Sequence, residues 1–276
     1  MTDDGRLEVT FRGVRGSVPT PVAENLGYGG NTSCIEVRSG GGQTLLIDGG
    51  TGVRTAGAAL IREAGQPKTT VHLLFTHFHW DHIQGLPFFA PLYSAENEVL
   101  FYSGLRPGGL REALEVQMSS PYYPIPLERL AAKRTFAEVT REFQLGEVSI
   151  HPFPLNHPQG ATGFRIECGG AVVVHASDNE HGDPRFDSLL IDHARNADVL
   201  IYDAQYTPEE YPSKRGWGHS TWKEGARVAR EAAVKRLVLF HHDPLRSDAD
   251  LSEIVTQARR EFENTDAATE GVTVRV

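Results

Sequence analysis

The segment from residue 77 to residue 82 gathers side chains that bind metal ions. It reads His77-Phe78-His79-Trp80-Asp81-His82 and follows an apolar run over 71–76. That run is typical of a buried strand, so the segment is expected in the loop at the end of the strand. Two histidines separated by one residue can converge on a single ion, whereas Asp81 and His82 project toward a neighbouring point. The layout therefore predicts two adjacent divalent metals.

A two-metal site needs further ligands from the ends of other strands. Three residues follow strand-like runs in this way: His157 after 150–155, Asp178 after 171–177 and His241 after 236–240. His242 competes with His241, but adjacent residues that leave a strand point to opposite sides, so only one of them should be a ligand. The alternative interpretation of the 77–82 segment is a histidine-rich surface loop. Its aromatic neighbours argue against that alternative, namely Phe75, Phe78 and Trp80.

The composition favours a soluble globular protein and excludes several functional classes. The chain has 276 residues, of which 39% are hydrophobic and 23% charged, and its net charge is −9. No apolar stretch approaches the roughly 20 residues that span a bilayer, and the first residues do not form a secretory signal. Cys34 and Cys168 suit a reducing cytoplasm, as packing residues rather than a disulfide. Without a basic stripe, a small anionic substrate is favoured over tRNA or DNA.

Hydrophobic periodicity predicts strands in two runs, each of which closes with helices. Strands are expected near 7–14, 32–38, 43–48, 71–76, 99–103, 134–139, 148–155, 162–168, 171–176, 198–202 and 236–240. Helices are expected near 52–64, 109–118, 185–195, 220–232 and 248–262, the last two starting at Ser220 and at Ser247-Asp248. This order predicts a two-layered sheet sandwich flanked by helices, in the α/β class. With no linker or repeat, residues 1–276 are expected to form a single domain.

The stretch over 118–127 is rich in proline and tyrosine and is not expected to form a regular element. It could wall or cover a pocket, or it could be a rigid surface connection. Both interpretations remain open at the level of sequence.

The sequence resembles the metallo-β-lactamase superfamily, whose hallmark is His-x-His-x-Asp-His followed by a distant His, Asp and His. The resemblance runs from the opening strands through 46–52 to His241. It implies a four-layer αββα sandwich with two metals at one edge. It further implies the ligand sets, with His77, His79 and His157 on the first metal, Asp81, His82 and His241 on the second, and Asp178 bridging both. Asp48 resembles the family's carboxylate that orients a ligand imidazole, although a turn residue before Gly49-Gly50 is the alternative.

Two metals would lower the pKa of a shared water and bind the oxygens of the group under attack, while Asp81 orients the nucleophile and takes its proton. Such a site hydrolyses esters, amides, lactones, thioesters or phosphodiesters. The segments 199–207 and 218–221 resemble the paired loops of the phosphodiesterase branch, which includes ribonuclease Z. The resemblance assigns Asp203 as the support of His219, and His219 as the group that contacts the phosphate and protonates the leaving alkoxide. The alternative for His219 is a solvated residue at a helix N-terminus.

One departure from ribonuclease Z argues against tRNA as the substrate. That enzyme characteristically inserts a long arm between the third and fourth metal motifs, whereas only 20 residues separate His157 from Asp178 here. The segments 13–19, 29–34 and 241–244 of this sequence match bacterial relatives more closely. Those relatives are described as metal-dependent hydrolases or as cyclic-nucleotide phosphodiesterase-like. In those turns Arg15, Ser17 and Asn31 could reach a substrate, but hydrogen-bonding turn roles are slightly favoured.

We therefore expect a cytoplasmic dinuclear hydrolase that acts on a small phosphodiester such as a cyclic nucleotide. The alternatives are a hydrolase of a carboxylic ester, lactone or thioester, and a non-catalytic metabolite sensor. The metals are expected to be zinc, with manganese or iron as alternatives for the same ligands, and the resemblance suggests a homodimer. Five histidines without motif support are expected to be packing or surface residues: His72, His151, His175, His181 and His193.

Overall fold

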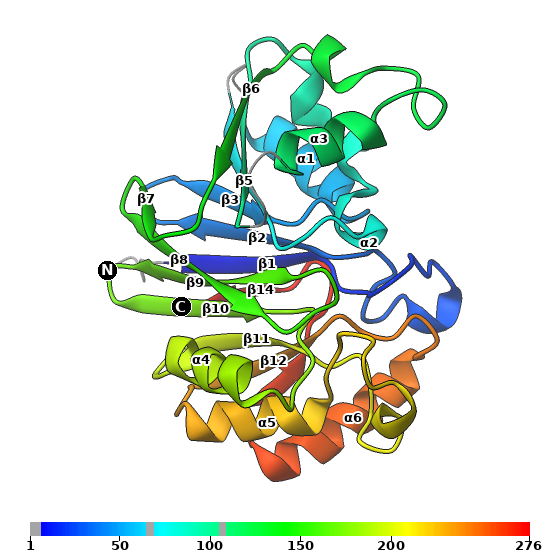
Figure 1. Ribbon diagram of the computed structural model, residues 1–276, viewed down its shortest axis with the longest axis vertical. Coiled ribbons are helices and arrows are strands. Elements are labelled where there is room, and N and C mark those ends of the chain that lie inside the picture. The colour runs from blue at the N-terminus through cyan, green and yellow to red at the C-terminus, as the bar shows by residue number, and fades with distance from the viewer. Residues whose placement is uncertain (1–6, 65–68, 105–108) are drawn as a thin grey trace.

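The computed structural model describes residues 7–64, 69–104 and 109–276. Two seven-stranded mixed sheets lie face to face, with α1 (Val53–Ala64), α2 (Trp80–Ile83) and α3 (Gly109–Gln117) outside one sheet. Outside the other sheet lie α4 (Pro184–Ala194), α5 (Trp222–Glu231) and α6 (Asp248–Glu261) (Figure 1). The expected four-layer αββα sandwich is confirmed.

The first sheet has the strand order β14-β1-β2-β3-β4-β5-β6. Its strands are β1 (Leu7–Gly13), β2 (Cys34–Ser39), β3 (Thr44–Ile47), β4 (Thr70–Phe75), β5 (Glu98–Ser103), β6 (Lys133–Glu138) and β14 (Thr273–Arg275). Strands β3 to β6 are parallel, with Ile47 opposite Leu74 in the register of β3 and β4. The carboxyl ends of β3 and β4 therefore lie at the same edge of the sheet.

The second sheet has the order β13-β12-β11-β10-β9-β8-β7. Its strands are β7 (Phe143–Leu145), β8 (Val148–Leu155), β9 (Ala161–Cys168), β10 (Ala171–Ala176), β11 (Val199–Asp203), β12 (Arg236–Phe240) and β13 (Thr265–Ala267). Strands β10 to β13 are parallel, and β8 runs in the same direction because β9 is antiparallel to both β8 and β10. The carboxyl ends of β8, β10, β11 and β12 therefore point to one edge, where ligands of open α/β sheets are usually bound.

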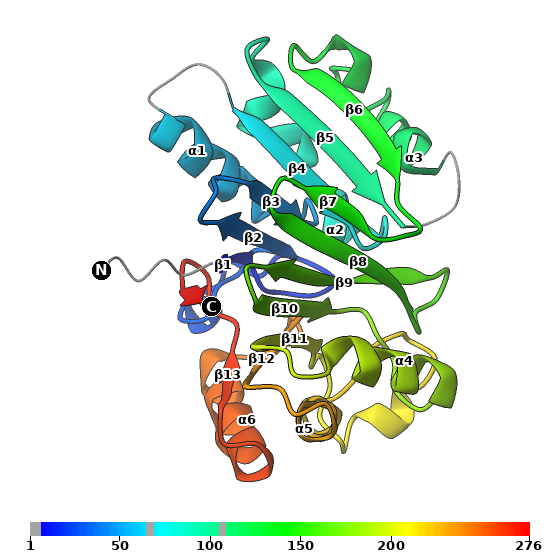
Figure 2. The same ribbon diagram turned by 90° about the vertical axis from the view of Figure 1, so that its left-hand side faces the viewer.

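In the part of the chain that the structure describes, three apolar cores hold the layers together. Buried side chains such as Ile47 and Phe164 fill the space between the sheets. Leu114 belongs to the core under α1 and α3, and Leu200 to the core under α4 to α6. Strands such as β11 are buried along their whole length because they are covered on both faces, which is why they read as continuous apolar runs. Figure 2 shows the two helical layers on opposite sides of the stacked sheets.

The predicted strands and helices are present within a few residues of their expected bounds. The sequence missed the three-residue strands β7, β13 and β14, which are too short for a periodic signal. It also missed α2, so Asp81 and His82 lie in a short helix rather than in a loop. The cap of α5 is Thr221 rather than Ser220, since the Thr221 side chain accepts a hydrogen bond from the backbone N–H of Glu224.

Strand β14 returns from the C-terminal half of the chain to pair with β1, with Val9 opposite Val274. The core between the sheets also contains residues from both halves. We therefore propose that residues 1–276 act as one domain. No helix of the described residues is long and apolar enough to cross a membrane.

Candidate metal centre

Three histidines form the first group at the common strand edge. One ring nitrogen from each of His77, His79 and His157 lies within 4.8 Å of the others. Nε2 of His157 is 3.1 Å from Nδ1 of His79. The opposite nitrogens are held from behind, because Nδ1 of His157 donates to the Gly218 carbonyl at 2.9 Å and Nε2 of His79 faces the Gln159 side-chain oxygen at 3.1 Å. These contacts leave the lone pairs directed toward one point.

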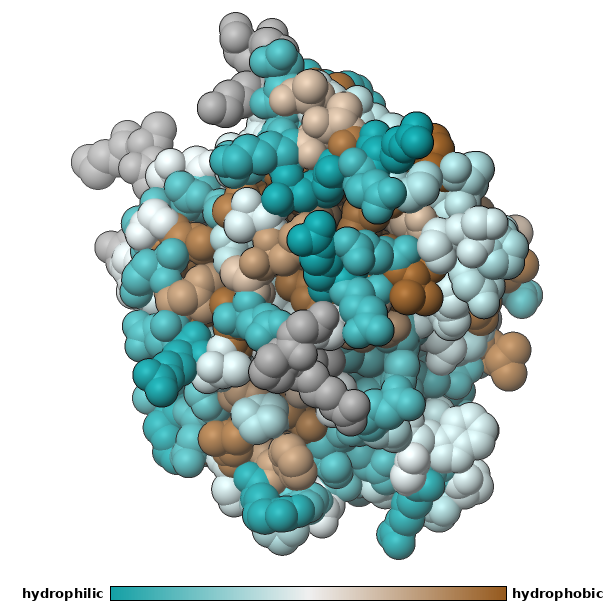
Figure 3. All heavy atoms as spheres, turned by 45° about the horizontal axis from the view of Figure 1, so that its top comes forward, coloured by the Kyte–Doolittle hydropathy of each residue, from teal (hydrophilic) through white to brown (hydrophobic). Residues whose placement is uncertain are grey.

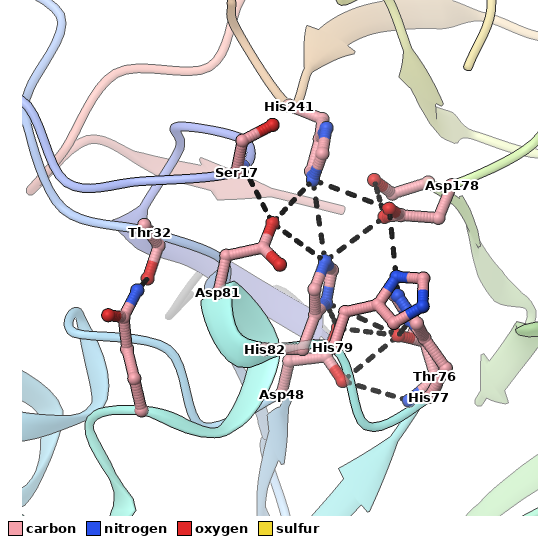
Figure 4. A network of polar contacts seen from close by, with 12 residues as sticks. Ser17, Thr32, Asp48, Thr76, His77, His79, Asp81, His82, Asp178 and His241 are labelled. Atoms are coloured by element: carbon pink, nitrogen blue, oxygen red, sulfur yellow. Dashed lines mark hydrogen bonds and ion pairs between the residues drawn. The ribbon is translucent and has the colours of Figure 1, made fainter. Parts of the chain in front are cut away.

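Asp81, His82 and His241 form a second group with the same spacing. Oδ2 of Asp81 is 3.4 Å from Nε2 of His82 and 3.2 Å from Nε2 of His241, and the two Nε2 atoms are 3.3 Å apart. Figure 4 shows the three side chains pointing toward one another from α2 and from the end of β12. His242 points away and its Nε2 donates to the carbonyl of Ala268 at 2.9 Å. Only the His241 side chain therefore reaches the cluster.

Asp178 lies between the two groups. Its carboxylate oxygens are 3.3 Å from Nε2 of His82, 3.4 Å from Nε2 of His241 and 3.9 Å from Nε2 of His77. It is the one carboxylate that reaches histidines of both groups among the described residues. This is the position that a bridging ligand requires.

Asp48 supports the cluster from behind, at the end of β3. It is fully buried, and its Oδ2 accepts a hydrogen bond from Nδ1 of His82 at 2.7 Å. Its Oδ1 accepts the backbone N–H of Thr76 at 2.8 Å, which ties the end of β3 to the end of β4. Because Nδ1 of His82 is engaged, its Nε2 faces the cluster. The orienting role expected for Asp48 agrees with this geometry, and the simple turn role does not account for it.

The donor atoms fit a divalent cation. Nε2 of His77 is buried and has no hydrogen-bond partner among the described residues, although it points into a cluster of nitrogens and carboxylate oxygens. Burial lowers the pKa of His77 and of His157, which favours the neutral imidazole that binds metals. Burial by itself would raise the pKa of Asp178, but His241 and His82 lower it below its ordinary range. Convergent lone pairs and ionised carboxylates suit a cation.

The second group carries protons that a metal would displace. Burial acts to lower the pKa of His241, but Asp178 and Asp81 raise it to about 9. The pKa of His82 is raised in the same way, by Asp178, Asp81 and Asp48 against the effect of burial. The carboxylates are thus balanced by imidazolium groups. A bound divalent ion would replace those protons as the positive charge.

A family model described as "Beta-lactamase superfamily domain" matches residues 43–242, which include every residue of this cluster. The chain belongs to the beta-lactamase superfamily. It is similar to ribonuclease Z of Thermoplasma acidophilum, at 26% identity over 94% of this chain and 93% of that protein. It also resembles two solved structures, the metallo-beta-lactamase fold protein YhfI from Bacillus subtilis and the short form of human tRNase Z.

The structural matches cover nearly the whole of each chain. The Bacillus subtilis protein gives a TM-score of 0.73 at 21% identity, covering 98% of this chain and 99% of that one. The human protein gives a TM-score of 0.70 at 20% identity, with the same coverage. At this level of sequence identity, the two matches show a shared fold. The expectation of a metal-dependent hydrolase of the beta-lactamase superfamily is thus confirmed at the level of the family.

In this superfamily member, Asp203 and His219 stand directly beside the cluster. Oδ2 of Asp203 accepts hydrogen bonds from Nδ1 of His219 and from the backbone N–H of Asp178, both at 2.9 Å. Oδ1 accepts the backbone N–H of Ser220 at 3.1 Å. Asp203 is fully buried, so it orients His219 and the Asp178 backbone together. His219 is not a solvated helix end; its ring stacks on that of His241, with centroids 4.8 Å apart.

Several supporting residues had no signal in the sequence. Gln205 accepts a hydrogen bond from Nδ1 of His241 at 2.9 Å, and Gln159 supports His79. Glutamines in loops carry no pattern that distinguishes these roles. Thr76, which immediately precedes the 77–82 segment, could have been noticed by its position. Its hydroxyl lies 3.0 Å from Nδ1 of His77 and 2.9 Å from Oδ2 of Asp48.

Glu180 organises the loop that carries His219. Its carboxylate accepts the backbone N–H groups of Gly216 at 2.7 Å and Gly218 at 2.8 Å, and the Tyr211 hydroxyl at 3.1 Å. Gly218 in turn accepts the Nδ1 proton of His157. Gly218 has a φ of 86°, and a Cβ there would lie 2.3 Å from Nδ1 of His157, so only glycine fits. One carboxylate thus links the support of His157 to the placement of His219.

The three residues in the Gly-rich turns have different roles. Arg15 is fully buried and donates to the carbonyls of Gly29 at 2.7 Å and Arg246 at 2.6 Å. Asn31 donates to Glu270 at 2.8 Å. These two agree with the favoured turn roles. Ser17 reaches the centre, since its backbone N–H donates to Oδ2 of Asp81 at 2.7 Å.

Backbone strain is concentrated around the cluster. Asp48, Asp178 and His241 have φ values of 63°, 61° and 60°, in the left-handed region that residues with a Cβ rarely adopt. Each immediately follows a strand or lies just beyond its end. Such conformations cost on the order of 1–3 kcal/mol each and persist only where surrounding contacts enforce them. The strained backbone at these three positions therefore lowers local stability, and it directs the three side chains toward one point.

The five remaining histidines largely match expectation. Nδ1 of His72 contacts the Tyr102 hydroxyl at 3.0 Å, and His193 stacks on Phe153. His175 is buried, while His151 is partly exposed. His181 is the exception, because it contacts the Ser220 hydroxyl at 2.8 Å, next to His219. Cys34 and Cys168 are buried and not disulfide-bonded.

The cluster opens to solvent through a hollow of about 420 Å³. This hollow, called here the mouth, is lined by Ser17, Phe78, His79, Trp80, Asp81, Asp178 and His219. The predicted catalytic residues Asp81 and His219 therefore face one space. From the 118–127 stretch, Tyr122 lines a neighbouring hollow, in agreement with the interpretation that this stretch walls a pocket.

Proposed function

We propose that this chain is a dinuclear metal-dependent phosphodiesterase that acts on a small phosphodiester such as a cyclic nucleotide. The observation that carries the proposal is the His219–Asp203 pair, buried beside Asp178 and facing the same mouth as Asp81. A phosphodiester needs a proton donor for its leaving alkoxide, and an imidazole oriented by a carboxylate provides one. The relatives named ribonuclease Z support phosphodiester chemistry.

In this proposal His77, His79 and His157 would hold one metal, Asp81, His82 and His241 would hold the other, and Asp178 would be shared by both. The donor set of nitrogen and oxygen suits zinc, with manganese or iron as alternatives. When bound, two such ions would polarise the phosphoryl oxygens and lower the pKa of an attacking water. The protein's own contribution is to fix the donors from behind, through Asp48, Gln205 and the Gly218 carbonyl.

His219 and Asp81 move the two protons of the reaction. Nδ1 of His219 stays bonded to Asp203, so its Nε2 is the atom that gives a proton to the leaving oxygen as the phosphorus–oxygen bond breaks. The attacking water forms the new phosphorus–oxygen bond, and its proton passes to the Asp81 carboxylate. Asp81 is placed for this role because it lines the mouth together with Asp178 and His219, where the attacked phosphate would lie.

The short connection between His157 and Asp178 favours a small substrate. Those residues form β9 and β10 and the tight turn between them, without an inserted arm. The net charge of −9 also disfavours a long polyanion. Relatives named ribonuclease Z nevertheless favour RNA as a substrate, so an RNA 3′ end is the second candidate. A cytoplasmic location and a homodimer remain predictions from sequence.

A substrate panel tests the proposal. Metal-replete protein is assayed with bis(p-nitrophenyl) phosphate, cyclic nucleotides, a precursor tRNA, a lactone and a thioester. We expect turnover of the phosphodiesters, with cyclic nucleotides preferred over tRNA. Turnover of only the lactone or thioester would replace the proposal with carboxylic ester chemistry, and metal and metabolite binding without any turnover would indicate a sensor.

A further inference from the structure

A second hollow lies next to the mouth, on the outer side of the first sheet. It has a volume of about 440 Å³ and is bounded by α2, α3, Phe78 and Tyr122. We call it the side pocket; its lining is Phe78, Trp80, Ile83, Gly109, Glu112, Ala113, Val116, Gln117 and Tyr122. Phe78 and Trp80 line both the side pocket and the mouth. A molecule whose phosphate lies at the mouth can therefore extend into the side pocket.

The side pocket exposes large apolar and aromatic side chains. Trp80 is 61% exposed, Val116 56% and Tyr122 67%. On the face shown in Figure 3, apolar side chains occur in small groups between polar ones. Exposed aromatic residues gathered around one hollow are typical of a binding site rather than of ordinary surface.

The walls of the side pocket are held in place by the core beneath them. The ring of Phe78 packs against that of Phe75, with centroids 5.8 Å apart. Gln117 is buried and donates from its amide nitrogen to the carbonyl of Ile83 at 2.6 Å, which ties α3 to α2. The side pocket is thus already formed before any ligand arrives, and its volume lies within the roughly 300–1,000 Å³ of small-molecule sites.

We propose that the side pocket binds a planar ring of the substrate, and specifically the nucleobase of a nucleotide whose phosphate lies at the mouth. This inference deepens the proposed function and rests on it. Every base has a π-face that stacks on aromatic side chains irrespective of its identity. Tyr122 and Trp80 supply such faces, and continuity with the mouth through Phe78 and Trp80 favours a part of the substrate over a separate partner.

Binding of a nucleotide and of its ring-less counterpart tests the proposal. The probes are adenosine 5′-monophosphate and ribose 5-phosphate, which share the phosphate and the sugar and differ by the base. Calorimetric titration of metal-replete protein should give at least about 10-fold tighter binding of the nucleotide, as stacking on aromatic residues provides. In Tyr122→Ala that preference should fall several-fold, whereas Tyr122→Phe, which retains the ring, should keep it.

Phe88→Ala is the matched control. Phe88 is 60% exposed, like Trp80 and Tyr122, but it lines neither hollow. This variant should keep the nucleotide preference. Loss of the preference in Phe88→Ala but not in Tyr122→Ala would place the ring site outside the side pocket and overturn the assignment.

Other outcomes would also overturn it. Equal affinity of wild-type protein for the two probes would mean that the side pocket takes no base. Unchanged nucleotide binding in Tyr122→Ala, together with a shift from dimer to monomer in sedimentation velocity, would assign this face to a second copy of the chain. Turnover of bis(p-nitrophenyl) phosphate, measured on the same proteins, tests the proposed phosphodiesterase activity separately from base binding in the side pocket. Absence of turnover with an intact nucleotide preference would contradict the phosphodiesterase and leave the side pocket standing.

Discussion

The two halves of the chain build the metal centre in different ways. The N-terminal half contributes one contiguous segment, in which His77, His79, Asp81 and His82 follow a single strand. The C-terminal half contributes isolated residues, each at the end of a different strand. The first arrangement is local and needs only a turn and the four-residue helix α2. The second exists only when parallel strands place their carboxyl ends at one edge.

The supports of the two halves differ as well. In the N-terminal half one carboxylate, Asp48, holds His82 and the end of β4 together. In the C-terminal half the support is distributed over Asp203, Gln205 and Glu180, which orient His219, His241 and the Gly216–Gly218 backbone. A concentrated support should fail as a unit when it is mutated, whereas a distributed one should fail in parts.

The largest effect on activity is expected from His219→Ala in the C-terminal half. Removal of the proton donor should lower phosphodiester turnover by about 100-fold or more, since general acid catalysis contributes roughly 10²–10⁴-fold. Metal content should stay at two ions per chain, because His219 is not among the proposed ligands. Steady-state kinetics and elemental analysis of the same preparation check both statements. His151→Ala, a partly exposed histidine on β8, should leave both unchanged.

The next effect is expected from Asp48→Asn in the N-terminal half. The one amide oxygen cannot serve both the Thr76 backbone N–H and Nδ1 of His82, so the contact that fixes Nε2 of His82 toward the cluster is weakened. Metal affinity at the site of Asp81, His82 and His241 should fall by roughly 10–100-fold. Asp48 reaches His77 only through the Thr76 hydroxyl, so titration with a competing chelator should show a smaller loss at the other site. Equal weakening of both sites would contradict this order.

The smallest effect is expected from Glu180→Gln in the C-terminal half. The amide still accepts one of the two N–H groups, so the loop of Gly216 and Gly218 should be loosened rather than lost. We expect a drop of about 10-fold at most in metal affinity at the His77, His79 and His157 site, the low end of the effect of such supports. Glu209→Gln, at an exposed glutamate, is the control. A greater loss than in Asp48→Asn would reverse the comparison between the halves.

The same contrast explains what could be predicted from sequence. The strands that precede the site residues are largely apolar and at least half buried, so their ends and the residues that follow them were predictable. His157, Asp178 and His241 took their assignment from family resemblance, because a single residue after a strand is a weak signal. The structure directs His241 into the cluster and His242 to the Ala268 carbonyl, as alternation at a strand end requires, and the role of His241 as a ligand stays a prediction.

The remaining contacts depend on tertiary structure. Gln205, Gln159 and Glu180 lie in loops whose path is set by packing. No local sequence pattern predicts their contacts. The short strands β7, β13 and β14 exist because a longer neighbour offers hydrogen bonds to them. The side pocket required the relative placement of α2, α3 and Tyr122, which no residue spacing encodes.

The metal content of purified, metal-replete protein tests the central claim most directly. Elemental analysis should find two divalent ions per chain in the wild type and a clear loss in Asp178→Ala, which removes the carboxylate shared by both groups. One ion or none in the wild type would contradict a dinuclear centre.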